Sequence, residues 1–264
     1  MTTDTTDTND PLVDLAADLE VEQRNLDDAV ATLDDEGWAR PTPAAGWAVR
    51  DQIAHLAASE DLAALAASDE DAFAAALAEA SELAADDHAA PHAGRASLTN
   101  AALLAEWRAR RAATIAAVLD GDRRRRIPWV AAAMSPMSFL TARLMETWAH
   151  GRDVFDALGT DQPATGALRH IAHLGVATRR FTYQNRGMEP PEAEVRVELT
   201  GPEGEAWTWG PPDATARVTG PAEDFCLAVT QRRAWTATSL EASGGAEGWL
   251  AIAQAYAGPP TDPP

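Results

Sequence analysis

Hydrophobic and polar positions alternate at helical spacing through most of the first 187 residues. Leucine, valine and alanine recur every three or four positions, with acidic residues between them, as expected for amphipathic helices. The long helices predicted in this way lie at 11–37, 49–67, 98–121, 137–159 and 165–187. An alanine- and acid-rich segment that reaches about residue 87 is also expected to be helical. Long helices joined by short loops predict an up-and-down bundle.

The pattern changes after residue 187. The segment 187–194, GMEPPEAE, has the composition of a linker. Short stretches with strand character follow at 195–200, 206–210 and 216–220, and the first of them alternates apolar and charged residues. Two more helices are expected after the strands, at 221–233 and 244–258.

These elements predict a mainly α protein in three parts. Residues 1–10 are expected to be a disordered tail, because they are polar and acidic. Residues 11–186 are expected to form the helical bundle, and residues 195–264 a small α+β domain.

Composition adds a strong acidic bias, with 41 acidic and 21 basic residues and a formal net charge of −20. All the basic residues are arginines. Such a charge excludes nucleic acid and anionic membranes as expected partners and leaves small molecules. The run RRRR at 123–126 is a local exception, either a solvated loop between helices or a patch for an anionic small molecule.

Three further features favour a soluble cytoplasmic protein. The first residues are too polar for a signal peptide. The longest uncharged run, 127–142, is too short to span a bilayer and contains two prolines. The single cysteine, Cys226, excludes an intramolecular disulfide and is expected to pack as a small core residue.

The predicted helix 137–159 carries a candidate for chemistry. Glu146 and His150 are four positions apart, so their side chains meet over one helical turn. Arg143 and Asp153 extend the same polar ridge, and Arg143 is placed to neutralise Glu146. A solvated ridge of surface charges is one interpretation, and two ligands of a metal ion are the other.

A metal site needs a third ligand, and histidine is the obvious source. The histidines of the chain are His55, His88, His92, His150, His170 and His173. His55 lies on the predicted helix 49–67, beside its buried face. With Glu146 and His150 it would complete a set of two imidazoles and one carboxylate, which leaves coordination positions for water and substrate. His170 and His173 share a helix face and are the alternatives.

Two segments also carry a family resemblance. WAVRDQIAHL (47–56) and ETWAHGRDV (146–154) resemble the signature segments of DinB-like metal-binding bundles. They are most similar to the N-terminal domain of mycothiol-dependent maleylpyruvate isomerase and its uncharacterised actinobacterial relatives. The resemblance extends over nearly the whole chain. It implies a four-helix bundle followed by a small α+β domain, with His55, Glu146 and His150 as metal ligands.

The family's second functional element is an arginine near the end of the helix that follows a V-x-G-P-A turn. That turn is VTGPA at 218–222 here, and the helix ends in TQRR. The resemblance therefore makes Arg232 the first candidate for a catalytic arginine and Arg233 the second. The sequence departs from the family pattern just before them, where Thr230 and Gln231 replace a Trp-Gly pair.

The resemblance implies a divalent metal, with zinc favoured by two histidines and a glutamate, although iron, nickel or manganese would accept the same ligands. It also implies mycothiol as a cosubstrate, whose thiolate would act on a small electrophilic or carboxylate substrate in an isomerase or S-transferase. Arg232 would hold the substrate carboxylate. The alternative is a metal-binding or small-molecule-binding module without turnover.

Two more expectations concern the surroundings of this site. Asp51 and Asp153 are candidates to orient the two imidazoles from behind, and helix pairing with neighbouring arginines is the equal alternative. Met134, Met137 and Phe139 could line an apolar cavity beside the ion, although core packing would explain them as well.

Overall fold

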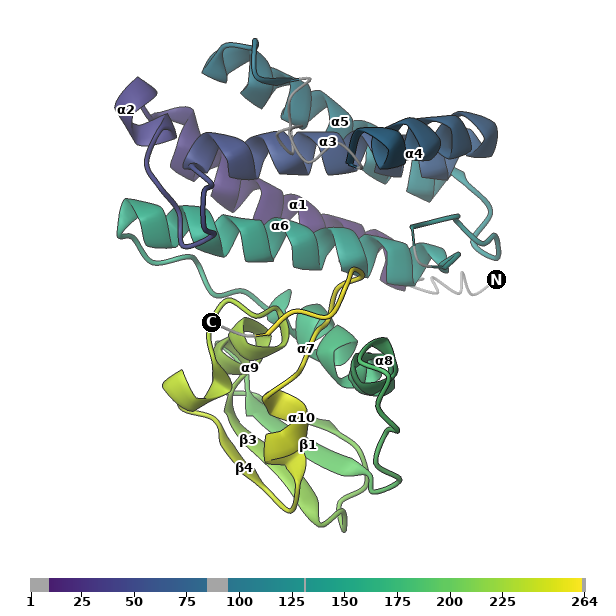
Figure 1. The fold of residues 1–264 in the computed structure, drawn as a ribbon, viewed down its shortest axis with the longest axis vertical. Helices are drawn as coiled ribbons and strands as arrows, with labels where there is room; N and C mark the ends of the chain where they lie inside the picture. Colours follow the sequence, from purple (N-terminus) through teal and green to yellow (C-terminus); the bar gives the residue numbers. More distant parts are fainter. Residues whose placement is uncertain (1–9, 85–94, 131, 263–264) are drawn as a thin grey trace, which may run out of the picture.

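The fold consists of a helical bundle with a small sheet-containing unit beneath it (Figure 1). The computed structural model describes residues 10–84, 95–130 and 132–262. The predicted tail at 1–10 lies outside these ranges except for Asp10, which caps the first helix. Within them, no helix is both long and apolar enough to cross a membrane.

The mainly α class predicted from the sequence is confirmed. In chain order the helices are α1 (Pro11–Ala31), α2 (Asp35–Trp38), α3 (Val49–Ser68), α4 (Glu70–Ala84), α5 (Asn100–Asp120), α6 (Pro136–Leu158), α7 (Leu168–Ala177), α8 (Arg179–Asn185), α9 (Ala222–Val229), the 3-10 turn η2 (Trp235–Ala237) and α10 (Ala246–Leu250). The long helices α1, α3, α5 and α6 form the bundle, with α3 packed on α5 and α6 packed on α1 and α3.

Helix α6 has well-defined ends because its sequence supplies both caps. The Ser135 side chain accepts the backbone N–H of Ser138, and Pro136 occupies the first turn, where its missing N–H costs nothing. Gly159 ends the helix with a φ of 69°, a left-handed conformation that glycine adopts without strain. These caps set the register in which α6 presents its side chains to the rest of the protein.

The sheet contains β1 (Val195–Thr200), β2 (Ala206–Trp209), β3 (Ala216–Pro221) and β4 (Glu241–Ser243) in the order β2-β1-β3-β4. β1 and β3 are parallel, and the two outer strands are antiparallel to their neighbours. β1 has the bounds predicted from its alternation, whereas the three-residue strand β4 has no pattern that predicts it.

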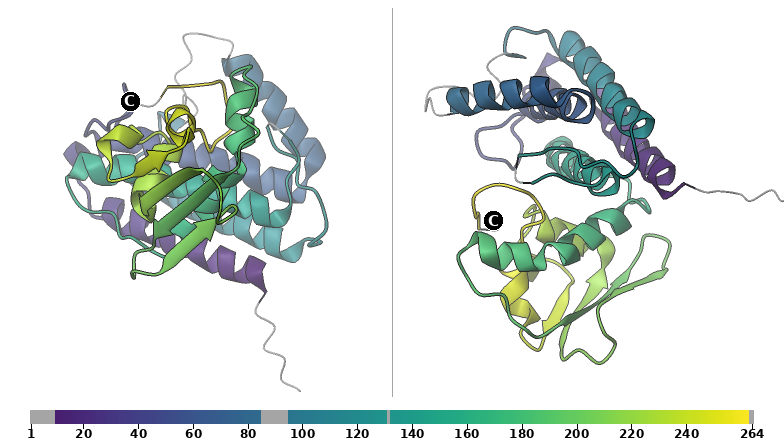
Figure 2. Two further views of the ribbon diagram at one scale, coloured as in Figure 1. Left: turned by 90° about the horizontal axis from the view of Figure 1, so that it is seen from below. Right: turned by 90° about the vertical axis from the view of Figure 1, so that its right-hand side faces the viewer.

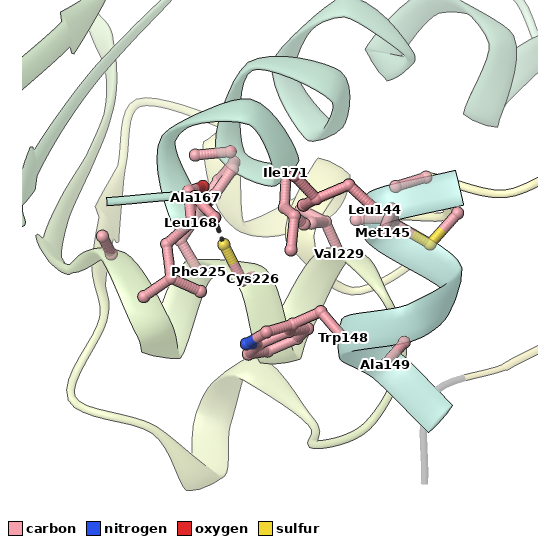
Figure 3. Packing of buried hydrophobic residues seen from close by; sticks show 14 of the residues in the cluster. Leu144, Met145, Trp148, Ala149, Ala167, Leu168, Ile171, Phe225, Cys226 and Val229 are labelled. Atoms are coloured by element: carbon pink, nitrogen blue, oxygen red, sulfur yellow. Dashed lines mark hydrogen bonds between the residues drawn. The ribbon is translucent and has the colours of Figure 1, made fainter. Parts of the chain in front are cut away.

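Helix α6 is the helix of the bundle that faces the sheet-containing unit (Figure 1 and Figure 2). One buried hydrophobic cluster runs from α6 into α7 and α9, where Leu144 and Trp148 lie near Ile171 and Val229 (Figure 3). Cys226 is fully buried in this cluster and its thiol points at the carbonyl of Leu168, 3.4 Å away. Burial raises the pKa of this thiol well above its ordinary value, as expected for a packed and unreactive cysteine.

Residues 165–187 differ from the single helix expected. They form α7 and α8, which meet at Thr178, and α7 packs against α9 and β2 as well as α6. Gly175 is one reason for the close approach of α7 to α9, because a Cβ there would lie 2.8 Å from a methyl group of Val229.

The arginine run at 123–126 is largely used in capping helix ends. Arg123 donates to the carbonyls of Val118 and Leu119, and Arg125 donates to Ala67 on α3 and Ala117 on α5. Guanidinium groups suit this role because carbonyls at helix C-termini have no partner within the helix. These bonds favour the loop interpretation of the run over the anion patch.

A buried glutamate on α1 gives a test of this packing. Glu22 is 2% exposed; one carboxylate oxygen accepts a hydrogen bond of 2.5 Å from the Thr165 hydroxyl, and the other has no hydrogen-bond partner among the described residues. Burial raises the pKa of Glu22 from 4.5 to about 7. Between pH 4.5 and about pH 7 the folded chain binds more protons than the unfolded chain. The contribution of Glu22 to stability therefore falls as the pH rises.

Glu22→Gln should therefore increase the free energy of unfolding at pH 8 by about 1–3 kcal/mol and change it little at pH 4.5. Urea unfolding at the two pH values measures the difference. Glu20→Gln, on the exposed face of the same helix, is the matched control and should not alter the pH dependence. Equal pH profiles for Glu22→Gln and wild type would show that Glu22 is ionised at neutral pH.

Candidate metal centre

Three of the residues selected from the sequence meet at one point. His55 on α3 and Glu146 and His150 on α6 each offer a ligand atom, and these atoms all lie within 4.8 Å of one another. Nε2 of His55 is 3.6 Å and Nε2 of His150 is 3.3 Å from the same oxygen of Glu146. Ligands at bond lengths near 2 Å from one ion lie roughly 3–4 Å apart, so this spacing suits a shared metal ion.

The three side chains are mostly buried but open on one side. The exposed fractions are 32% for His55, 21% for Glu146 and 14% for His150. The two imidazole rings are 4.4 Å apart between centroids. Trp47 stacks on the ring of His150 at 6.0 Å and lies tilted against His55 at 5.5 Å. The Trp47 indole therefore restricts the rotation of both imidazole rings, and the three side chains remain partly exposed.

A buried amide, which the sequence did not single out, orients His150. Gln52 is fully buried on α3, and its Oε1 lies 2.6 Å from Nδ1 of His150. Its Nε2 donates to the hydroxyl of Thr42, which in turn donates to the carbonyl of Trp47. Because this chain of donors places the Gln52 oxygen toward the ring, Nδ1 of His150 must carry the proton. Nε2 is the ring nitrogen that faces Glu146.

The electrostatics favour the protonation states that bind metals. Burial lowers the pKa of His150 to about 4, so the ring is neutral near pH 7. Burial alone would raise the pKa of Glu146, but its contacts with His150 and His55 hold it well below 4.5. A neutral imidazole and an ionised carboxylate are the forms that coordinate a divalent cation.

The aspartates expected behind the imidazoles have other partners. Asp51 accepts the backbone N–H of Ala48 and so caps the start of α3. Asp153 is paired with Arg232, whose Nη2 is 3.2 Å from a carboxylate oxygen. The expectation that these residues orient His55 and His150 is therefore not supported by any contact in the described structure, because the local helix end and the C-terminal unit take up their oxygens.

Arg232 connects the C-terminal unit to α6. Its Nε donates to the carbonyl of Ala149 at 3.0 Å and its Nη1 to the carbonyl of Thr230 at 2.9 Å, in addition to the Asp153 pair. Arg232 therefore contacts the residue that precedes His150 on α6. Arg233 is half-buried, and its side chain makes no hydrogen bond or ion pair within the described residues.

A cavity of about 530 Å³ opens beside the three converging residues. His55, Glu146 and Arg143 form one part of its wall, and most of the remaining wall is apolar. The cavity is lined by residues of α3, of α7 and α8, of the loop that precedes α6, and of the C-terminal segment. Met134 lines the cavity as expected, whereas Met137 is exposed and Phe139 is packed in the core against Trp129.

The remaining histidines lie elsewhere. Nε2 of His170 is 3.1 Å from a carboxylate oxygen of Asp18 on α1, and Nδ1 of His173 accepts from the indole of Trp209. His88 and His92 are outside the described residues.

Comparison with known families gives two matches. The family described as the mycothiol maleylpyruvate isomerase N-terminal domain matches residues 19–155, which is more than half of the chain. A second family, described as wyosine base formation, matches residues 191–242.

Similar proteins and structures agree with the first match. Two proteins described as uncharacterized, from two strains of Mycobacterium tuberculosis, are each 48% identical over 250 residues, covering 92% of this chain and 95% of the relative. A crystal structure of the mycothiol-dependent maleylpyruvate isomerase has a TM-score of 0.55 and 14% identity, covering 88% of this chain and 93% of that one. A histidine-to-alanine variant of that enzyme has the same values. At this identity the structural likeness concerns the fold.

Proposed function

The chain belongs to the family of the mycothiol maleylpyruvate isomerase N-terminal domain, and from this membership we propose that it is a metal-dependent enzyme that uses a low-molecular-weight thiol. The proposed reaction is isomerisation of, or S-transfer to, a small electrophilic or carboxylate substrate. Zinc is the proposed metal, mycothiol the proposed cosubstrate and the cytoplasm the proposed location.

One observation carries this proposal: two imidazoles and a carboxylate converge, and His55 and Glu146 of this set line a cavity large enough for a small molecule. A site with only three protein ligands leaves positions for other molecules, which is typical of catalytic rather than structural zinc. The side chains that would hold the ion are His55, Glu146 and His150. When bound, the ion would lower the pKa of a thiol or water beside it.

The residues around these ligands have separate tasks in the proposed reaction. Gln52 keeps the proton of His150 on Nδ1, and Trp47 holds both rings in place. The apolar wall of the cavity excludes water from the reacting atoms.

The two proposed reactions share their first step. The sulfur of the thiol bonds to one carbon of an activated double bond, which becomes a single bond that can rotate. In an isomerase the same sulfur–carbon bond then breaks. In an S-transferase it is kept, and the thiol proton ends on the neighbouring carbon.

The test of the proposal is an assay of metal-replete protein with mycothiol and a panel of unsaturated dicarboxylates and other electrophiles. Glu146→Ala is the control, because it removes the carboxylate of the ligand set. Turnover by wild type above this control supports an enzyme. Turnover equal to the control would reject the enzyme hypothesis and leave a binding module. The largely apolar wall of the cavity is the observation that favours this alternative.

Arg232 is the proposed catalytic arginine, with Arg233 as the second candidate. Arg232 would have to release Asp153 before it could hold a substrate carboxylate. We expect Arg232→Ala to retain the wild-type metal content and to lose turnover by more than about tenfold. Arg233→Ala, measured beside it for metal content, melting temperature and turnover, tests the second candidate. If Arg232→Ala turns over substrate like wild type, the role passes to Arg233.

A further inference from the structure

Arg143 lies in the wall of the cavity, one helical turn before Glu146 on α6. It is 3% exposed. A guanidinium group stays charged at any physiological pH, so this is a permanent positive charge in a largely apolar enclosure.

The charge of Arg143 has no carboxylate partner within 4.0 Å in the described part of the chain. Its Nη1 donates to the Ser59 hydroxyl, its guanidinium carbon lies 4.7 Å from the centre of the Trp129 ring, and its Nε is buried without a hydrogen bond. Arg143 therefore does not form the ion pair with Glu146 that their spacing suggests, and it acts on Glu146 and on the buried Glu60 only from beyond 4.0 Å.

Arg50 and Arg125, which are partly buried, donate to backbone carbonyls, but other largely buried arginines contact a carboxylate. Arg111 contacts Asp27, Arg152 contacts Asp156 and Glu223, and Arg232 contacts Asp153. Burial of a charged group without an opposite charge is unfavourable, and proteins rarely retain it unless a ligand supplies the partner.

We propose that Arg143 binds the carboxylate of a small substrate whose apolar body occupies the rest of the cavity. This inference rests on the proposed function and adds to Arg232 a second group for a substrate carboxylate, inside the cavity. Trp129 covers one face of the guanidinium, Nη1 donates to Ser59 and Nε is buried, so Nη2 is the donor that remains to contact a carboxylate oxygen. The apolar body of the substrate would contact the apolar wall of the cavity, which includes Leu62, Met134, Leu174 and Phe181. One guanidinium balances one carboxylate, whereas a phosphate dianion would require more donors.

The proposal is tested with benzoate and benzamide, which have the same shape and differ in charge. Isothermal titration calorimetry on metal-loaded and on chelator-stripped protein gives the two affinities. We expect wild type to bind benzoate roughly 10- to 100-fold more tightly than benzamide in both forms, because a charge-assisted hydrogen-bonded pair contributes this much. No preference for benzoate in either form would overturn the proposal without any variant.

Arg143→Gln should lose the preference for benzoate while keeping its metal content and circular dichroism spectrum. Arg143→Lys should keep part of the preference, since the charge remains without the planar fork. Arg110→Gln, which removes an exposed arginine paired with Asp61 on the opposite side of α3, is the control for net charge and should bind benzoate like wild type.

These outcomes separate the inference from the proposed function. If the preference for benzoate requires metal and persists in Arg143→Gln, the metal rather than Arg143 binds the carboxylate, and the proposed role of Arg143 is overturned. A preference that depends on Arg143 but occurs without any thiol-dependent turnover would keep the carboxylate site and reject the enzyme.

Discussion

His55→Ala is expected to purify with less than about a tenth of the metal bound by wild type. His55 is the one member of the converging set that comes from α3, so its removal leaves two ligands on a single helix turn. Two ligands hold a divalent ion far more weakly than three. Metal content measured by mass spectrometry after gel filtration in the presence of a weak chelator gives the comparison directly.

The fold should survive this change, because the His55 side chain is 32% exposed and lies outside the hydrophobic core. The melting temperature of wild type should rise on addition of zinc, whereas that of His55→Ala should not. His170→Ala is the matched control: it removes a half-exposed histidine that is also paired with a carboxylate. Equal metal content in His55→Ala and His170→Ala would reject the metal centre.

Gln52→Leu is expected to weaken metal binding by about 10- to 100-fold without touching a ligand. Leucine has nearly the same size but cannot accept the proton of His150 Nδ1, so the ring is free to adopt the other tautomer or to rotate. The binding constant is measured by competition with a chromophoric chelator. Nitrogen chemical shifts of the His150 ring would show the change of tautomer independently.

Thr42→Val separates this effect from general loss of the buried network. It removes the hydroxyl that accepts the hydrogen bond from the Gln52 amide but leaves the contact between Gln52 and His150. We expect metal binding to weaken much less than in Gln52→Leu. Equal losses in the two variants would show that the network acts as packing, and that the oxygen of Gln52 has no particular role toward His150.

The fold class followed from the spacing of hydrophobic residues, which depends only on the geometry of single elements. A period of 3.6 defines α1, α3, α5 and α6, and a period of two defines β1 with its observed bounds. β4 was not predicted because three residues carry no period.

The candidate site shows the same division between local and long-range information. Glu146 and His150 could be paired from the sequence because one helical turn brings them together. His55 required a resemblance, since nothing in the spacing of residues states that α3 lies beside α6. Local spacing also suggested Asp51 and Asp153 as supports, whereas the observed support for His150 is Gln52, from a different helix.

The sequence by itself determined the long helices of the bundle, the first three strands and the types of ligand available, because hydrophobic periodicity and residue chemistry are properties of short segments. The tertiary structure decided which side chains share one environment. It placed Arg232 against α6 and brought α7 against α9, and within the described residues it left Arg143 at the cavity without an ion pair. The physical reason is that burial and ion pairing depend on distances between segments that are remote in the chain, and only packing of the whole core determines those distances.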